Sequence, residues 1–150
     1  MDQKGLRGSS ATRIDEKGRL KVPTMFRGVI HDQHGPDVFV TSVTGENVRI
    51  YPMPVWLEIE RKLSQMPSNH PSRLKFLDRV NYYGQVGELD SQGRVVIPPV
   101  LRESASIIGD VRVFGRIDYI DVWNAERFAQ KLQRELWTDE DALRLSEHGI

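Results

Sequence analysis

Residues 14–27 read IDEKGRLKVPTMFR, and residues 89–102 read LDSQGRVVIPPVLR. Apolar positions of the first stretch fall on apolar positions of the second at a constant shift along the chain. The identical pairs at this shift are Asp15/Asp90, Gly18/Gly93, Arg19/Arg94, Pro23/Pro98 and Arg27/Arg102. An internal repeat of this kind indicates two copies of one supersecondary unit.

Both copies predict the same series of elements: a strand, a hairpin, a strand, a short helical turn, two further strands and a helix. We expect the segments to be a first half-unit (6–66), a connecting helix that stops at Gly84 (67–84), a second half-unit (85–137) and an acidic tail (138–150). Asn124 is the expected N-cap of the helix that ends the second copy, and Thr138 opens an expected capping box in the tail.

Neither copy has an obvious complete core of its own. The economical interpretation is that the two half-units complete one barrel together. We therefore expect an α+β protein in which a pseudo-symmetric β-barrel is built from two fused half-units, with flanking helices.

The repeated hairpin has a specific turn chemistry. Asp15 and Asp90 suit the first position of a type I turn, and Gly18 and Gly93 suit the left-handed position of a three-residue hairpin with a bulge. The next four residues, 19–22, alternate polar and apolar, which predicts two cations on one face and two core residues on the other. Residues 94–97 are more apolar, so we expect them to be more buried. Pro23 and Pro98 suit the first turn of the following helices.

Charge is distributed unevenly between the copies. The chain carries 21 Lys and Arg against 21 Asp and Glu, which excludes a uniformly basic coat. Residues 13–27 nevertheless have a net charge of +3, whereas residues 88–103 have −1. The first hairpin is therefore the basic one. Asp15 could simply hold Arg19 by an ion pair, and for the repeated aspartates and glycines this structural role is favoured. For Arg19, which follows an exposed turn beside other cations, a binding role is favoured.

The doubled D-x-x-G-R-x-x-x-P motif, in a chain of 150 residues, resembles the MraZ family of bacterial transcriptional regulators. The resemblance extends over roughly residues 6–137. It includes Leu6-Arg7-Gly8 (with Leu6 where the family has Phe), Ile50-Tyr51-Pro52 and Asp121-Val122-Trp123. The chain departs from the family pattern in a few extra residues before Leu6 and in its acidic tail.

This resemblance implies a fold similar to the SpoVT/AbrB swapped-hairpin barrel and a sequence-specific DNA-binding regulator. It implies repression at direct repeats upstream of a division and cell-wall gene cluster, by a homo-oligomeric ring. Double-stranded DNA and further copies of the chain are thus the expected partners. The residues expected to bind DNA are Arg13, Lys17, Arg19, Lys21 and Arg94.

Other functional classes receive little support from the sequence. The chain has no cysteine, no apolar run of about 18 residues and no common catalytic motif, so we expect no enzyme, cofactor or membrane span. No apolar segment follows the N-terminus, which predicts a cytoplasmic protein. The resemblance to a DNA-binding family implies that it is nucleoid-associated. His31 to His34 are interpreted as a polar surface loop rather than a metal site. The remaining alternative is an oligomeric protein-interaction module that does not read DNA.

Overall fold

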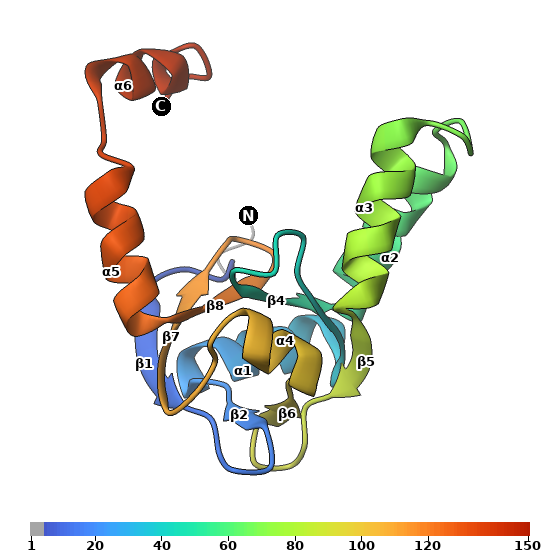
Figure 1. The fold of residues 1–150 in the computed structure, drawn as a ribbon, viewed down its shortest axis with the longest axis vertical. Coiled ribbons are helices and arrows are strands. Elements are labelled where there is room, and N and C mark those ends of the chain that lie inside the picture. Colours follow the sequence, from blue (N-terminus) through green and yellow to red (C-terminus); the bar gives the residue numbers. More distant parts are fainter. Residues whose placement is uncertain (1–4) are drawn as a thin grey trace.

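The computed structural model describes residues 5–150 (Figure 1). The first half contains β1 (Ser9–Arg13), β2 (Arg19–Lys21), α1 (Thr24–His34), β3 (Asp37–Thr41), β4 (Val48–Pro52) and α2 (Met53–Ser64). The second half contains β5 (Gln85–Glu88), β6 (Arg94–Val96), α4 (Pro99–Ser104), β7 (Asp110–Gly115), β8 (Ile120–Asn124) and α5 (Ala125–Arg134). Helix α3 (Pro71–Tyr82) connects the halves, and α6 (Asp139–Ser146) follows α5. The order of elements predicted for each copy is confirmed, but the short helical turn expected in the first copy is a helix of 11 residues, α1.

The strands of the two halves are interleaved. The six-stranded antiparallel sheet has the order β1-β7-β8-β4-β3-β5, and β2 pairs with β6 in a second, two-stranded sheet. In the repeat, β1 corresponds to β5, β7 to β3 and β8 to β4. Replacing each strand with its equivalent gives the same order read from the other edge of the sheet. The first strand of each half therefore pairs with a strand of the other half. Both halves of the chain thus contribute strands to one sheet.

The α+β class is confirmed, but a closed barrel is not. Among residues 5–150, the six-stranded ladder ends at β1 on one side and at β5 on the other, and no strand pairing joins these two ends. The β2–β6 ribbon is a separate ladder, connected to β1 by one isolated bridge between Ile14 and Leu20. The hydrogen-bonded strands thus form an open sheet and a ribbon.

One core is shared by both halves. Equivalent positions of the repeat are fully buried in it: Leu20, Val22 and Phe26 from the first half, and Val95, Ile97 and Leu101 from the second. Complete burial of side chains of this kind stabilises a fold by about 1.5–3 kcal/mol each. Because the two sets pack into one cluster, neither half would keep this stabilisation alone.

The repeated prolines precede the helices by one position. Pro23 and Pro98 are the N-cap residues of α1 and α4, not members of the first turn as predicted. Their extended backbone ends the ribbon strands and turns the chain into each helix. Helix α1 also continues through His31 to His34, so the predicted surface loop is in fact the last turn of a helix. Gly35 ends that helix with a φ of 80°.

The α2–α3 hairpin is attached to the sheet through aromatic packing. The Trp56 ring lies 4.6 Å from the Phe39 ring and 6.3 Å from the Phe76 ring, measured between centroids. Gly84 follows this hairpin, but its φ is not among the positive ones. It is required for a different reason: a Cβ there would collide with the Val80 carbonyl oxygen and come within 2.5 Å of Phe39.

The C-terminal helices begin with the expected caps. The Asn124 side chain accepts a hydrogen bond from the Arg127 backbone N–H at 3.0 Å, and Thr138 and Asp141 form a reciprocal capping box. Figure 1 shows α2–α3 and α5–α6 projecting on two sides of the sheet, away from the hairpin turns. None of the helices within residues 5–150 has the length and apolar character needed to cross a bilayer.

Candidate nucleic-acid interface

The turn of the first hairpin is organised by Asp15. Its Oδ1 accepts hydrogen bonds from the backbone N–H groups of Lys17 (3.0 Å) and Arg19 (2.9 Å), and its Oδ2 accepts one from the Arg19 Nε at 2.7 Å. Gly18 has a φ of 78° and donates its N–H to the Asp15 carbonyl. One carboxylate thus closes the turn and also orients the arginine that leaves it.

The second hairpin repeats this geometry. Asp90 accepts from the backbone N–H groups of Gln92 (2.9 Å) and Arg94 (2.8 Å), and from the Arg94 Nε at 2.9 Å. Gly93 has a φ of 74°. The predicted structural role of Asp15, Gly18, Asp90 and Gly93 agrees with these contacts, and the ion pair considered for Asp15 and Arg19 is present in both copies.

These contacts change the acidity of both aspartates. The backbone hydrogen bond from Arg19 lowers the pKa of Asp15, and the arginine side chain lowers it further. The backbone hydrogen bond from Arg94, together with its guanidinium, lowers the pKa of Asp90 in the same way. Both carboxylates are therefore charged at neutral pH, and each holds its arginine through Nε.

The β2–β6 ribbon collects cations on its outer face. Leu20 and Val95 are opposite each other and buried, so the residues that flank them in each strand face outward. The outward set consists of Arg19 and Lys21 from β2, and Arg94 and Val96 from β6. The side chains of Arg19 and Arg94 are 33% and 27% exposed. The ribbon thus combines residues from hairpins that are far apart in the sequence.

Lys21 and Arg94 lie directly opposite each other in this ribbon. Like charges at directly opposed cross-strand positions destabilise a sheet. Across the ladder, Arg19 faces Val96 rather than an acidic residue. The outer face therefore brings three cations together, of which Arg19 and Arg94 are each paired with an aspartate, whereas Lys21 has no acidic residue opposite it across the ladder. A two-stranded ribbon also has the width that the major groove of B-DNA accepts.

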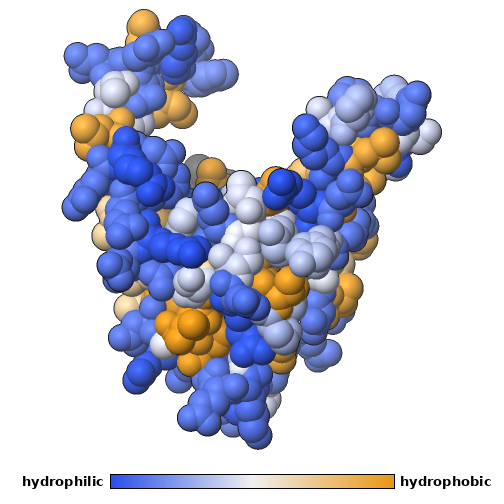
Figure 2. Space-filling view, viewed as in Figure 1, coloured by the Kyte–Doolittle hydropathy of each residue, from blue (hydrophilic) through white to orange (hydrophobic). Residues whose placement is uncertain are grey.

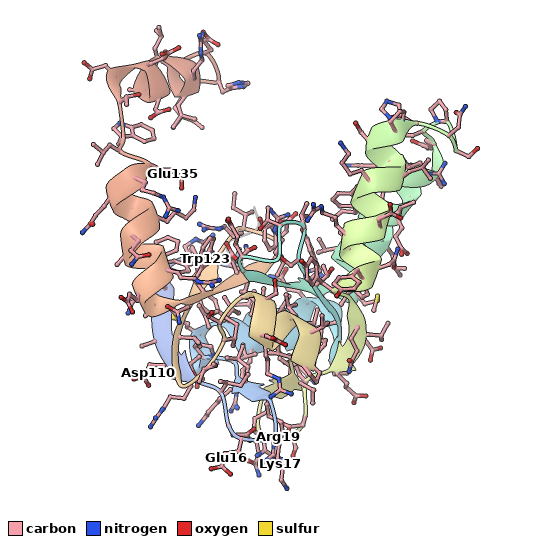
Figure 3. The ribbon with its side chains drawn as sticks, viewed as in Figure 1. Glu16, Lys17, Arg19, Asp110, Trp123 and Glu135 are labelled. Atoms are coloured by element: carbon pink, nitrogen blue, oxygen red, sulfur yellow. The ribbon has the colours of Figure 1, made fainter. Side chains whose placement is uncertain are left out.

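Lys17 and Arg13 lie beside this ribbon face. Figure 3 shows Lys17 next to Glu16 and Arg19 at the end of the molecule, where the first hairpin turns. Arg13 ends β1, and its Nε lies 3.1 Å from Asp110, with both side chains widely exposed. An exposed ion pair of this kind contributes only about 0–1 kcal/mol, so a phosphate could compete for Arg13. The five predicted residues thus lie on or next to one end of the molecule.

Arg27 and Arg102 have a role that the sequence did not reveal. Each lies over the turn of the other half: Arg102 covers Gly18, and Arg27 covers Gly93. Arg27 donates from Nη1 to the Gln92 carbonyl at 2.7 Å, and Arg102 donates from Nε to the Ile97 carbonyl at 3.0 Å. Their identity in both copies is the signal that could have indicated an equivalent structural role.

The apolar sequence of the second ribbon strand predicts that it is more buried than the first, and this prediction is wrong. Val96 is 44% exposed, and β2 and β6 share the same burial pattern. The repeat places Val96 at the position of Lys21, which faces outward. The ribbon's geometry therefore overrides the apolar character of this strand, and Val96 adds an apolar contact point to the ribbon face.

The chain matches the protein family described as "MraZ protein, putative antitoxin-like" over residues 6–79 and 85–145. The chain belongs to the MraZ family. A protein of Acidobacterium capsulatum named transcriptional regulator MraZ is 49% identical over 144 residues, covering 96% of this chain and 99% of that protein. One of Koribacter versatilis, with the same name, is 48% identical with the same coverage. One of Syntrophobacter fumaroxidans is 37% identical over 79% of this chain and 78% of that protein.

Other motifs through which the chain resembles the MraZ family are structural. Asp121, which is buried, accepts hydrogen bonds from the Asn47 amide at 2.6 Å, the Trp123 indole at 3.0 Å and the Arg116 guanidinium. Leu6 is buried and bridges to Ile117. Within residues 5–150, no three histidine, cysteine or acidic side chains gather as metal ligands would. The hairpin end, which consists of the turns at residues 15–18 and 90–93 and the β2–β6 ribbon, is therefore the site on which we base a function.

Proposed function

We propose that this protein is a sequence-specific transcriptional regulator that binds double-stranded DNA through its hairpin end. The observation that carries this proposal is the ribbon face, on which Arg19, Lys21 and Arg94 converge from two halves of the chain. The names of the relatives support a role in transcription. Arginine oriented by a carboxylate can present its terminal nitrogens to the O6 and N7 of guanine, and lysine suits phosphate.

The proposal has finer parts that rest on the family resemblance. Residues 6–66 and 85–137 act as two half-units, linked by 67–84, in one barrel-like body. Several copies assemble into a ring in the cytoplasm, associated with the nucleoid, and bind direct repeats upstream of the division and cell-wall gene cluster. Because RNA polymerase cannot bind promoter DNA that this protein covers, the expected outcome is repression. The protein needs no cofactor and catalyses no reaction.

The second candidate is an oligomeric interaction module with a protein target. Exposed large apolar residues on the projecting helices favour it, among them Leu57, Leu74 and Leu132. In this alternative, the basic hairpins join subunits instead of contacting DNA. The two candidates differ in their response to salt. Binding to phosphate weakens steeply with salt because counterions are released, whereas an apolar interface responds little.

A titration followed by fluorescence anisotropy tests the proposal. The probe is a duplex from the region upstream of the protein's own reading frame, and the control is a shuffled duplex of equal composition. We expect tighter binding to the upstream duplex, and an affinity that falls with a slope of about −0.9 per phosphate neutralised on a logarithmic plot. Equal affinity for both duplexes, or no binding at low salt, would reject DNA readout and leave the protein-interaction module.

A further inference from the structure

The C-terminal arm, defined here as residues 135–150, has an apolar surface that its own chain does not cover. No residue of α6 is buried. The exposed large apolar side chains of this arm are Leu136, Trp137, Leu143, Leu145 and Ile150. Figure 1 shows α6 standing apart from the sheet. An isolated helix of eight residues is marginal in water, so most of the stability of such a helix must come from packing against a partner.

The charge of this arm restricts what the partner can be. It contains five acidic residues and one arginine, for a net charge of −4. The side-chain bonds of α6 are satisfied within the arm: Arg144 pairs with Glu140 and Glu147, and Asp141 caps the helix. An acidic and apolar arm repels DNA and fits a surface that is basic and aromatic.

A surface of that kind is present on α3 of the same chain. A groove there is lined by Lys75, Asp78, Arg79, Tyr82 and Tyr83. Helix α3 carries three cations and one acid, for a net charge of +2. The Tyr82 ring lies 5.0 Å from the Tyr83 ring in an edge-on arrangement, and Tyr82 is 67% exposed. The groove thus offers aromatic faces beside two basic side chains.

The arm cannot occupy the groove of its own chain in this arrangement. Figure 1 shows α6 and α3 on two separate projections, at the upper left and the upper right of the view, with the sheet below them. The space-filling view in Figure 2 likewise shows two separate projections, each with apolar patches among polar atoms. A second copy of the chain has the complementary surface and can present it from outside. The two surfaces differ, so each copy can bind one neighbour on each side.

We propose that the C-terminal arm of one copy docks in the α3 groove of the next copy. Trp137 packs against Tyr82 and Tyr83, and the acidic residues of the arm face Lys75 and Arg79. This inference rests on the homo-oligomer of the proposed function and names the surfaces that form it. A contact between two different surfaces is heterologous, and it closes into a ring where the rotation permits.

Two single variants and their mixture test this contact. Trp137→Asp damages the arm and leaves the groove intact, whereas Tyr82→Asp damages the groove and leaves the arm intact. Both side chains are about two-thirds exposed, so neither change removes a core contact. Ile108→Asp is the matched control, because Ile108 is 74% exposed and lies outside both surfaces. Masses are measured by light scattering, and folding is checked by circular dichroism.

The mixture gives the sharpest outcome. We expect the full chain and the Ile108→Asp control to have a mass several times 17.2 kDa, and each of the other variants alone to have the mass of one chain. An equimolar mixture should contain dimers of twice 17.2 kDa, because one intact arm meets one intact groove and the remaining surfaces are blocked. Lys75→Glu and Leu143→Asp provide a second pair with the same expectation.

Three outcomes would count against the contact. If either variant keeps the mass of the full chain, or if the mixture contains only single chains, the arm does not bind this groove, and the ring must form through another surface. If the unmodified chain is itself a monomer, both this inference and the ring fail. DNA binding is measured separately by the anisotropy titration, so its failure is distinguishable from the failure of the arm contact.

Discussion

The Arg19 Nε lies 2.7 Å from the Asp15 Oδ2, and the same carboxylate also accepts the Arg19 backbone N–H. One aspartate thereby fixes both the turn and the direction of the arginine that follows it. Arg94 and Asp90 repeat this relationship on the neighbouring strand. The ribbon face therefore presents two arginines whose orientation is set before any ligand binds, which reduces the entropy that binding must overcome.

Replacing Arg19 with alanine should abolish specific DNA binding and leave the fold intact. Loss of a bidentate contact to guanine costs about 1–3 kcal/mol, and the loss multiplies when several copies engage the DNA together. Arg61→Ala is the control, since Arg61 is also an exposed arginine paired with a carboxylate, Glu58, but lies on α2. The anisotropy titration compares both variants with the unmodified protein. Unchanged affinity in a correctly assembled Arg19→Ala protein would exclude Arg19 from the interface.

Lys17→Ala and Lys21→Ala should affect specific and random DNA alike. Both lysines are exposed, and an ammonium group suits a phosphate better than it distinguishes bases. We expect each variant to reduce the salt slope by about one unit for every site engaged. The measurement is affinity for the upstream and shuffled duplexes across a salt series. A changed preference between the two duplexes, with random binding intact, would instead give these lysines a role in base readout.

Acid should weaken the hairpins because the folded chain lowers the pKa values of Asp15 and Asp90 below the ordinary 3.8. Above a pH of 3.8, both carboxylates are ionised in the folded and in the unfolded chain, and their full contribution to the stability of the fold is present. As the pH falls, the unfolded chain takes up protons first, and the stabilisation disappears as the pH passes through the lowered pKa values.

The double variant Asp15→Asn/Asp90→Asn tests this pH dependence. It keeps the side-chain oxygens that accept the backbone N–H groups but removes both charges. We expect its melting temperature to lie below that of the unmodified protein at pH 6, and the difference to shrink from about pH 4 downward. Circular dichroism melts across this range provide the measurement. A difference that stays constant down to pH 2 would show that the charges do not stabilise the turns.

Gly18→Ala should destabilise the fold by more than the cost of placing alanine in a left-handed backbone conformation. Gly18 has a φ of 78°, and a Cβ there would come within 2.6 Å of the Arg102 guanidinium carbon. Gly109→Ala is the control, since Gly109 also has a positive φ, of 63°, but open space around it. A left-handed conformation costs alanine about 1–2 kcal/mol at either position. Urea unfolding should show that Gly18→Ala lowers the free energy of unfolding by about 1 kcal/mol or more beyond the loss in Gly109→Ala. Equal losses in the two variants would mean that the Arg102 side chain moves aside at no cost.

Local features of the fold were predictable from the sequence. The Asp-x-x-Gly turns, the Asn124 cap and the Thr138 capping box depend on residues within a few positions of one another, and their chemistry has few alternatives. The repeat also indicated that both halves would have the same element order. These predictions required only local geometry and an internal comparison.

The pairing between the halves was not predictable in the same way. β1 pairs with β7, which is about one hundred residues away in the sequence. Other strands of the chain have a similar length and a similar alternation of polar and apolar residues, so the sequence does not identify β7 as the partner. The roles of Arg27 and Arg102 depend on that pairing, because each guanidinium reaches the other half's turn only after the halves interleave. The exposure of Val96 follows from the ribbon too, since its neighbour Val95 takes the buried side.

A hydroxyl-radical footprint on the DNA upstream of the reading frame tests the central claim most directly, since it reports where the hairpin ends meet the duplex. Our account predicts protected patches that recur about every 10–10.5 base pairs along direct repeats, one helical turn apart. It also predicts that Arg19→Ala, at the same concentration and mass, leaves the DNA unprotected. Identical protection by the Arg19→Ala protein, or no protection by the unmodified protein at saturating concentration, would contradict it.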